Sequence, residues 1–205
     1  MKFNTFLDNK KTLEVIHNTS IREVILEHKT LSRMGRLNTK SLLSLTDIAL
    51  NSGFSPVLQW DILCTESNFE NCIKLLENLP LSKFVAIRVQ DIGAAEWVRN
   101  ELPEIPIHFI AETGNHNLTG LLRWHKYFGQ QLQRFALSSE LPISTLISYC
   151  RTLTVPCEIL AVGKILLFYT PRKLLSNFET SKNSFEFMEK ILVPSDQQQR
   201  QFQTL

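Results

Sequence analysis

The sequence lacks the patterns that mark several large classes of protein. It has no apolar run approaching the roughly 20 residues that a membrane-spanning helix needs. Residues 1–5 lack the charged start and apolar stretch of a secretory signal peptide, so we expect a cytoplasmic protein with no membrane span. Lysine and arginine number 22 against 20 acidic residues, and this balance gives no electrostatic case for binding nucleic acid or an anionic membrane surface.

Cysteine is scarce and does not follow the common metal-binding spacings. The four cysteines are Cys64, Cys72, Cys150 and Cys157, and none forms a C-x-x-C pair. Cys72 and Cys150 fall on apolar helix faces, as small core residues do. Free buried thiols are the usual state of cysteine in a cytoplasmic chain. The spacings also miss those of zinc and iron–sulfur ligands, so we expect structural thiols.

The short motifs of the best-known enzyme classes are absent as well. No G-x-S-x-G, H-E-x-x-H or Walker loop occurs, and no glycine-rich phosphate loop follows the first predicted strand. The basic residues Arg33 and Arg36 form either an anion site or a solvated loop. The residues alone therefore define no complete catalytic or metal-binding constellation.

What the sequence does contain is an alternation of strand and helix patterns. Its 205 residues, 43% of them hydrophobic, suffice for one sizeable core. Short apolar, β-branched runs predict strands at residues 3–7, 22–27, 56–63, 84–89, 105–111, 134–137 and 157–162. Apolar residues at helical spacing predict helices at residues 40–51, 69–76, 91–102, 118–125 and 143–150. Cap candidates are Ser67, Asp91, Asn117 and Ser139.

This order predicts an α/β fold with parallel strands and right-handed crossovers. Seven or eight such units favour a TIM-type (β/α) barrel, either complete or incompletely closed, because the last strand is weakly marked. An open doubly wound sheet is the alternative, although it usually carries a glycine-rich phosphate loop. We assign residues 1–178 to the barrel domain and residues 179–205 to an extension with a short helix and a Gln-rich tail.

Candidate chemistry lies where the strands end, because parallel barrels gather function at that rim. The polar residues that closely follow apolar runs are Asp61, Gln90, Asp91, Glu112, Ser139, Glu140 and Lys164. A pair of these carboxylates is a possible acid/base device. Asp91 and Ser139 have helix capping as the alternative role.

Three further residues carry two readings each. His108 lies inside an apolar strand, where a core histidine is commoner than a catalytic base. His116 is in a loop at the rim and is freer to act. Glu158 starts a strand at the end away from the rim, and a buried carboxylate there needs an arginine or lysine partner.

Five sequence blocks, in order and spacing, resemble peptidase family U32, the collagenase-like proteases. Residues 88–93 read R-V-Q-D-I-G and residues 105–108 read I-P-I-H, similar to the family's V-Q-D-L-G and L-P-[IL]-H. Residues 137–141 (L-S-S-E-L) and 158–163 (E-I-L-A-V-G) are similar to L-x-R-E-L and E-V-F-V-H-G. Residues 169–178 (Y-T-P-R-K-L-L-S-N-F) resemble Y-S-P-R-C-L-L-S-N-Y, so the likeness covers roughly residues 21–178.

The resemblance implies a TIM-type barrel and two kinds of activity. The family was named for peptidases, but several members act in hydroxylation of RNA bases or of the ubiquinone ring. Those members hold a four-iron–four-sulfur cluster on cysteines, one of which belongs to the P-R-C motif. The layout here, including residues 32–33, looks closest to the smaller partner of the oxygen-independent ubiquinone-hydroxylation pair.

The sequence departs from the family at the cluster ligands. The P-R-C cysteine is Lys173, no cysteine follows Cys157, and none lies near Leu31. A cluster needs about four converging thiolates, so we expect no cofactor and a lost cluster. From the rim positions and the resemblance together, the catalytic candidates are Gln90, Asp91, His108, Glu112 and Glu140. The substrate-binding candidates are Arg33, His116, Glu158, Tyr169 and Arg172.

Three functions follow as hypotheses. The first is a cluster-less accessory or binding subunit, partnered by a fuller relative from the same family or by a second copy of itself. The second is a hydroxylation-type enzyme with a remodelled site around Gln90, Asp91, Glu112 and Glu140. The third is a collagenase-like protease, for which no nucleophile–base pair or zinc motif can be named.

Overall fold

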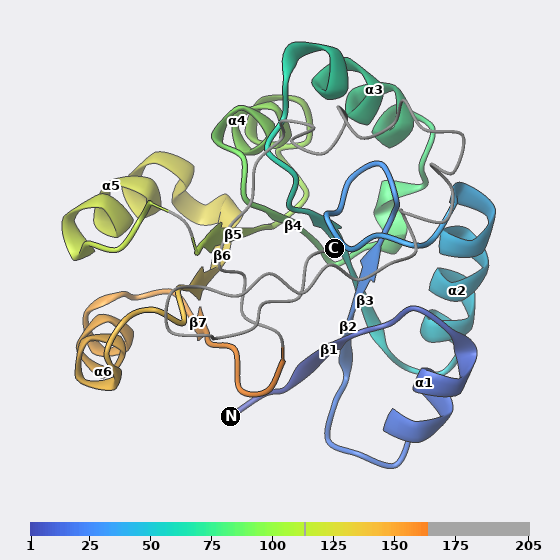
Figure 1. Ribbon diagram of the computed structural model, residues 1–205, viewed down its shortest axis with the longest axis horizontal. Helices are drawn as coiled ribbons and strands as arrows, with labels where there is room; N and C mark the ends of the chain where they lie inside the picture. The colour runs from blue at the N-terminus through green and yellow to red at the C-terminus, as the bar shows by residue number, and fades with distance from the viewer. Residues whose placement is uncertain (113, 164–205) are drawn as a thin grey trace, which may run out of the picture. The chain divides into compact units, whose positions relative to one another are not determined.

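The structure is a computed structural model that describes residues 1–112 and 114–163. Strands and helices alternate along this part of the chain (Figure 1). The strands are β1 (Asn4–Phe6), β2 (Glu23–Glu27), β3 (Ser55–Trp60), β4 (Ala86–Val89), β5 (Ile107–Ala111), β6 (Leu132–Leu137) and β7 (Cys157–Glu158). The helices are α1 (Lys10–Ile16), α2 (Thr39–Asn51), α3 (Glu66–Glu77), α4 (Ile92–Glu101), α5 (Leu118–Phe128) and α6 (Ile143–Thr152). Two 3₁₀ turns, Leu81–Lys83 and Gly129–Gln131, precede β4 and β6.

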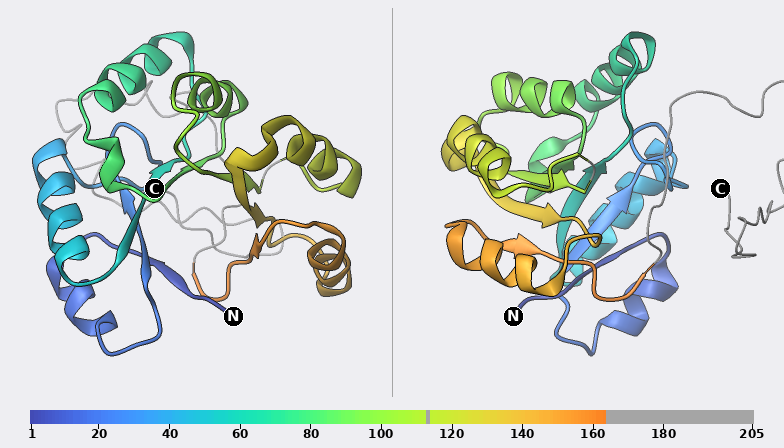
Figure 2. Two further views of the ribbon diagram at one scale, coloured as in Figure 1. Left: turned by 180° about the vertical axis from the view of Figure 1, so that it is seen from behind. Right: turned by 60° about the vertical axis from the view of Figure 1, so that its left-hand side comes forward.

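The seven strands form one parallel sheet in the order β1-β2-β3-β4-β5-β6-β7. Figures 1 and 2 show that the sheet curls and that the helices lie on its outer side. Among the described residues β1 and β7 form no ladder with each other, so the curl stays open along one seam. The predicted α/β fold is thus confirmed as an incomplete TIM-type barrel.

Alternate residues of each strand face opposite sides of the curled sheet. Ile87 and Val89 of β4 belong to the main hydrophobic core, together with Phe109 and Phe135 of the neighbouring strands. This core lies between the sheet and the helices. On the inner side, Ile25, Val57 and Ala86 form a separate small apolar cluster. Branched aliphatic side chains usually fill the inside of such barrels.

Most predicted elements are present, and two of the predicted caps are confirmed. Asp91 caps α4 by accepting a hydrogen bond from the Ala94 amide at 2.9 Å. Asn117 caps α5 by accepting one from the Gly120 amide at 2.7 Å. Because the cap side chains occupy the free amides of the first turn, the helix starts are set locally.

The other two predicted caps are wrong. The residue before α3 is Thr65, so Ser67 lies inside that helix. Helix α6 follows Pro142, whose fixed backbone dihedral suits a helix start. Upstream of it, Ser138 takes a turn role instead, because its hydroxyl accepts a hydrogen bond from the Glu140 amide at 3.2 Å.

The burial predicted for Cys150 is also wrong. Helix α6 buries Leu146 alone among its ten residues, and Cys150 is exposed. Its apolar neighbours Ile143 and Ile147 are exposed as well. Cys72 on α3 is fully buried, as predicted.

The last predicted strand is shorter than predicted. Strand β7 covers Cys157–Glu158, and residues 159–162, which the sequence pattern also assigned to the strand, are not in a strand. The predicted boundary at residue 178 lies outside the described residues. In the part of the chain that the structure describes, no helix has both the length and the apolarity to cross a membrane.

Candidate functional site

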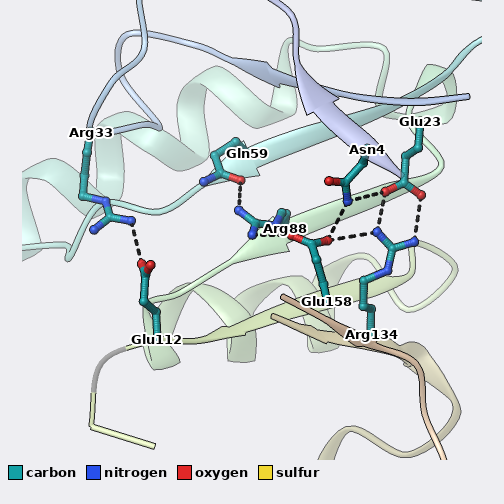
Figure 3. Close-up of polar contacts among 8 residues, drawn as sticks. All are labelled: Asn4, Glu23, Arg33, Gln59, Arg88, Glu112, Arg134 and Glu158. Atoms are coloured by element: carbon teal, nitrogen blue, oxygen red, sulfur yellow. Dashed lines mark hydrogen bonds and ion pairs between the residues drawn. The ribbon is translucent and has the colours of Figure 1, made fainter. Parts of the chain in front are cut away.

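The inside of the curled sheet holds a network of charged side chains (Figure 3). Glu158 of β7 lies at its centre. It accepts hydrogen bonds from Arg88 of β4 at 2.6 Å and from Arg134 of β6 at 3.1 Å. It also accepts one from the side chain of Asn4 on β1 at 2.7 Å, which joins the two edges of the open seam. Glu158 thus has the basic partners that its burial required.

A second carboxylate completes the network. Glu23 of β2 makes a bidentate ion pair with Arg134, whose Nη2 donates to Glu23 Oε2 at 2.9 Å. Burial alone would raise the pKa of Glu23, but Arg134 outweighs it and holds that pKa below its ordinary value. Burial likewise opposes the charge of Glu158, whose pKa is lowered by Arg88, Asn4 and Arg134. Both carboxylates are therefore ionised, and two arginines balance two glutamates.

His108 lies in the same interior on β5. It pairs in register with Arg88 of β4 and Arg134 of β6, and it is 3% exposed. Burial, with the charge of Arg134, lowers the pKa of His108 to about 4. Among the described residues its Nδ1 has no hydrogen-bond partner. The imidazole is therefore neutral and weakly basic near pH 7, which suits a buried structural histidine better than a general base.

The rim of the barrel carries a separate row of polar groups. Arg33, in the loop between β2 and α2, donates from Nε to Asp61 Oδ2 at 2.8 Å. Its backbone amide donates to Asp61 Oδ1 at 2.9 Å, and its Nη2 lies 3.3 Å from Glu112 Oε2. Burial disfavours the charge of Arg33, but both carboxylates outweigh it and raise the pKa of Arg33. Arg33 thus ties the ends of β3 and β5 together.

His116 and Glu140 continue this row towards β6. His116 Nε2 lies 3.0 Å from the backbone oxygen of Glu112 and 3.8 Å from Glu140 Oε2. The side chain of Glu140 is 59% exposed. The structure therefore brings together four predicted residues, Arg33, Glu112, His116 and Glu140, along one part of the rim.

Asp91 and Gln90 stand apart from that row. Both oxygens of Asp91 accept backbone amides, Oδ1 from Ala94 and Oδ2 from Cys64 at 3.2 Å. Asp91 is thus occupied in holding α4 and the loop after β3. Gln90 is buried at the end of β4, where its backbone amide donates to the backbone oxygen of Trp60 at 3.2 Å.

Sequence reasoning missed most of the interior network. The missed residues are Asn4, Glu23, Gln59, Arg88 and Arg134. Charged residues at alternate positions of otherwise apolar strands were the available signal, and only Glu158 was read in that way. The predicted substrate-binding residues Tyr169 and Arg172 lie outside the described residues.

The cysteines do not form one set of ligands. The thiols of Cys64, in the loop after β3, and Cys72, on α3, are neighbours, and those of Cys150 on α6 and Cys157 on β7 are neighbours. Strands β4, β5 and β6 separate the two pairs in the sheet. Because a four-iron–four-sulfur cluster needs about four converging thiolates, this arrangement does not fit one. Within residues 1–112 and 114–163, no three or more His, Cys, Asp or Glu side chains are grouped as metal ligands.

Comparison with known proteins agrees with the fold. The family model described as Peptidase family U32 matches residues 9–186. The structure of the U32 peptidase Mk0906 is similar, with a TM-score of 0.58 and 11% sequence identity, over 78% of this chain and 68% of that chain. At this identity the likeness shows the fold alone. No curated protein matches the chain.

Proposed function

This chain belongs to peptidase family U32, and we propose that within the family it is a cluster-less accessory or binding subunit. We place it beside the family's oxygen-independent hydroxylation proteins and in the cytoplasm. The proposal extends the resemblance of residues 21–178 to the smaller partner of such a pair.

The arrangement of the cysteines carries the proposal. The chain has four cysteines, and they lie in two separated pairs instead of around one point. A family member that cannot gather four thiolates depends on a relative for cluster chemistry. This dependence favours a subunit that binds a partner or presents a ligand.

The state of the rim carboxylates supports the same role. Asp91 uses both oxygens on backbone amides, and Asp61 and Glu112 both contact Arg33. General acid/base catalysis needs a carboxyl group within hydrogen-bond reach of the reacting proton. Here these groups hold the protein together instead.

Iron and acid-labile sulfide, measured on protein expressed and purified without oxygen, test the missing cluster. We expect a colourless, folded protein with iron far below one atom per chain. A stoichiometric cluster with its visible absorption would contradict the proposal and favour the hydroxylation-type enzyme instead.

Light scattering after size-exclusion chromatography tests the accessory role. The chain is mixed with a U32-family protein that carries the cluster cysteines and comes from the same cell. We expect a stable complex of the two proteins. The alternative outcome is a homodimer of this chain alone.

Activity of the isolated chain would decide against an accessory role. The accessory role would be contradicted if the isolated chain hydrolysed gelatin or hydroxylated an aromatic ring, and if the Asp91→Asn variant lost this activity. Asparagine is a fair test because it keeps the helix cap through its side-chain oxygen while removing the charge.

A further inference from the structure

A pocket of about 260 Å³ lies at the ends of β1 and β2. Leu7 and Leu37 line it and are buried, at 2% and 7% exposure. Phe6 and Met34 also line it but leave 45% and 36% of their surfaces open to solvent. Among the described residues, the pocket therefore has apolar walls that are partly open to solvent, at the rim where parallel barrels hold their ligands.

The loop that forms one wall is fixed in place by close backbone contacts. A Cβ atom added to Gly35 would meet the backbone oxygen of His28 at 2.3 Å, so only glycine fits there. The loop is pinned on one side by Arg33, whose amide donates to Asp61. On the other side the Leu37 amide donates to the Glu27 backbone oxygen at 3.3 Å. Met34 and Arg36, on either side of Gly35, are thus held at the pocket in advance.

The pocket also presents separated charges of opposite sign. Glu27 and Arg36 both line it, yet among the described residues neither side chain has a hydrogen bond or an ion pair. Asp8 is different, because its carboxylate accepts hydrogen bonds from Asn9 at 2.6 Å and from Thr12 at 3.2 Å. The pocket therefore offers one open carboxylate and one open guanidinium.

We propose that this pocket binds an aliphatic α-amino acid as its zwitterion, with the ammonium group on Glu27 and the carboxylate on Arg36. The aliphatic side chain then lies against Phe6 and Met34. A cation alone would leave Arg36 without a partner, and an anion alone would leave Glu27 without one. The small volume fits a ligand below the size of most drug-like molecules. This site extends beyond the proposed accessory role and does not depend on it.

The charges around Glu27 add a pH dependence to the binding. Burial, followed by the charge of Asp61, raises the pKa of Glu27 to about 7. Arg88 and Arg33 oppose this effect, and Asp8 adds to it. The ammonium group favours the ionised carboxylate, so binding near pH 7 releases a proton. Affinity should therefore rise between pH 6 and pH 8.

Calorimetric titration of the full chain with L-leucine tests the proposal. The matched probes are 3-methylbutylamine, which lacks the carboxylate, and 4-methylpentanoate, which lacks the amine. We expect leucine to bind at least tenfold more tightly than either probe. Glu27→Gln should weaken leucine binding at least tenfold and remove its pH dependence, and Arg36→Gln should weaken it at least fivefold.

Two controls keep the result specific. Glu104→Gln and Arg151→Gln change exposed charges away from the pocket and should leave leucine binding unchanged. Gly35→Ala leaves Glu27 and Arg36 in the chain but disturbs the loop, and it should also weaken binding. The proposal is overturned if wild-type protein shows no leucine binding at 10 mM, if 3-methylbutylamine binds as well as leucine, or if Glu27→Gln binds leucine normally. Each of these outcomes leaves the accessory role standing, since that role is decided by iron content and complex formation.

Discussion

His108 shows how one buried side chain in the interior of the barrel makes the stability of the protein depend on pH. It lies between Arg88 and Arg134 in the register of the sheet, and both arginines are committed to Glu158. A proton on the imidazole would place a third positive charge among them. The same surroundings that keep His108 neutral therefore make acid conditions unfavourable to the folded state.

We expect His108 to contribute a loss of stability as the pH falls from about 6.5 to about 4, whereas Glu27, whose pKa is raised to about 7, contributes in the opposite direction. Unfolded His108 takes up its proton near its ordinary pKa of 6.5, whereas in the folded protein the pKa is about 4. Between these values the unfolded state binds more protons, and the loss reaches about 3 kcal/mol. Urea unfolding of wild type and His108→Gln at pH 7 and pH 5 measures it.

The variant lacks the His108 contribution, so the change in stability from pH 7 to pH 5 should differ between the two proteins. The variant should keep the further loss at lower pH, because Glu23 and Glu158 have lowered pKa values and their stabilisation disappears as they become protonated. An identical slope in both proteins between pH 7 and pH 5 would sink the assignment to His108.

At the level of single residues, the sequence was informative where the chemistry of one residue dictates the kind of partner it needs. A carboxylate at the start of a buried strand needs a cation, and Glu158 has Arg88 and Arg134. It did less well where the partner lies on a distant strand. Glu23 and Arg134 are 111 residues apart, and nothing local to either one indicates the other.

At the scale of elements, the turn between β4 and α4 depends on Asp91. One carboxylate oxygen caps the helix and the other holds the loop after β3 through Cys64. Asp91 therefore joins two strand–helix units. This dual contact explains why a residue in a family signature can be structural here.

Asp91→Ala should destabilise the protein by about 1 kcal/mol through the lost helix cap, with a further contribution from the freed Cys64 amide. Asp91→Asn should retain most of the cap and lose less than half as much. Urea unfolding at pH 7 with circular dichroism compares the two variants. Equal losses would show that the charge of Asp91, rather than its hydrogen bonds, stabilises the turn.

Elements with strong periodicity were predictable, and short ones were not. Helix α3 buries Cys72 and Leu76 on one face and was predicted from that spacing. Helix α1 has seven residues and was not predicted, because two buried residues, Leu13 and Ile16, make too weak a pattern. The prediction for α6 was misled by the same kind of pattern, because most of the residues at helical spacing in α6 are exposed.

At the scale of the whole described sheet, side chains rather than a strand ladder bridge the open seam. Asn4 of β1 and Glu158 of β7 meet there, and Glu158 binds arginines of β4 and β6 as well. One carboxylate thus connects four strands. Removing one partner from a buried ion-pair network is costly because the remaining charges lose their compensation.

Glu158→Gln should therefore destabilise the protein by about 3 kcal/mol at pH 7. The matched control is Asp47→Asn, which removes the partly exposed ion pair between Lys83 and Asp47 and should cost less than about 1 kcal/mol. Thermal unfolding of both variants makes the comparison. A Glu158→Gln protein as stable as the control would show that the seam does not depend on the network.

The sequence predicted the parallel barrel and the position of its weak closure, because both follow from the order and strength of local patterns. It did not predict the charged interior. Alternating polarity along a strand shows that two faces differ, but not that the polar face is the enclosed one. Only the curl of the sheet places Arg88 and Glu158 inside.

The alternation of charge and aliphatic residues also fixes how the strands can slide past one another. If β4 moved by one residue, Arg88 would enter the apolar layer beneath the helices, and Ile87 and Val89 would face Glu158 and Arg134. A barrel filled with aliphatic residues on both sides would tolerate such a shift far better. The ionic interior therefore makes misaligned strand pairings unfavourable during folding, and it selects a single alignment of the sheet.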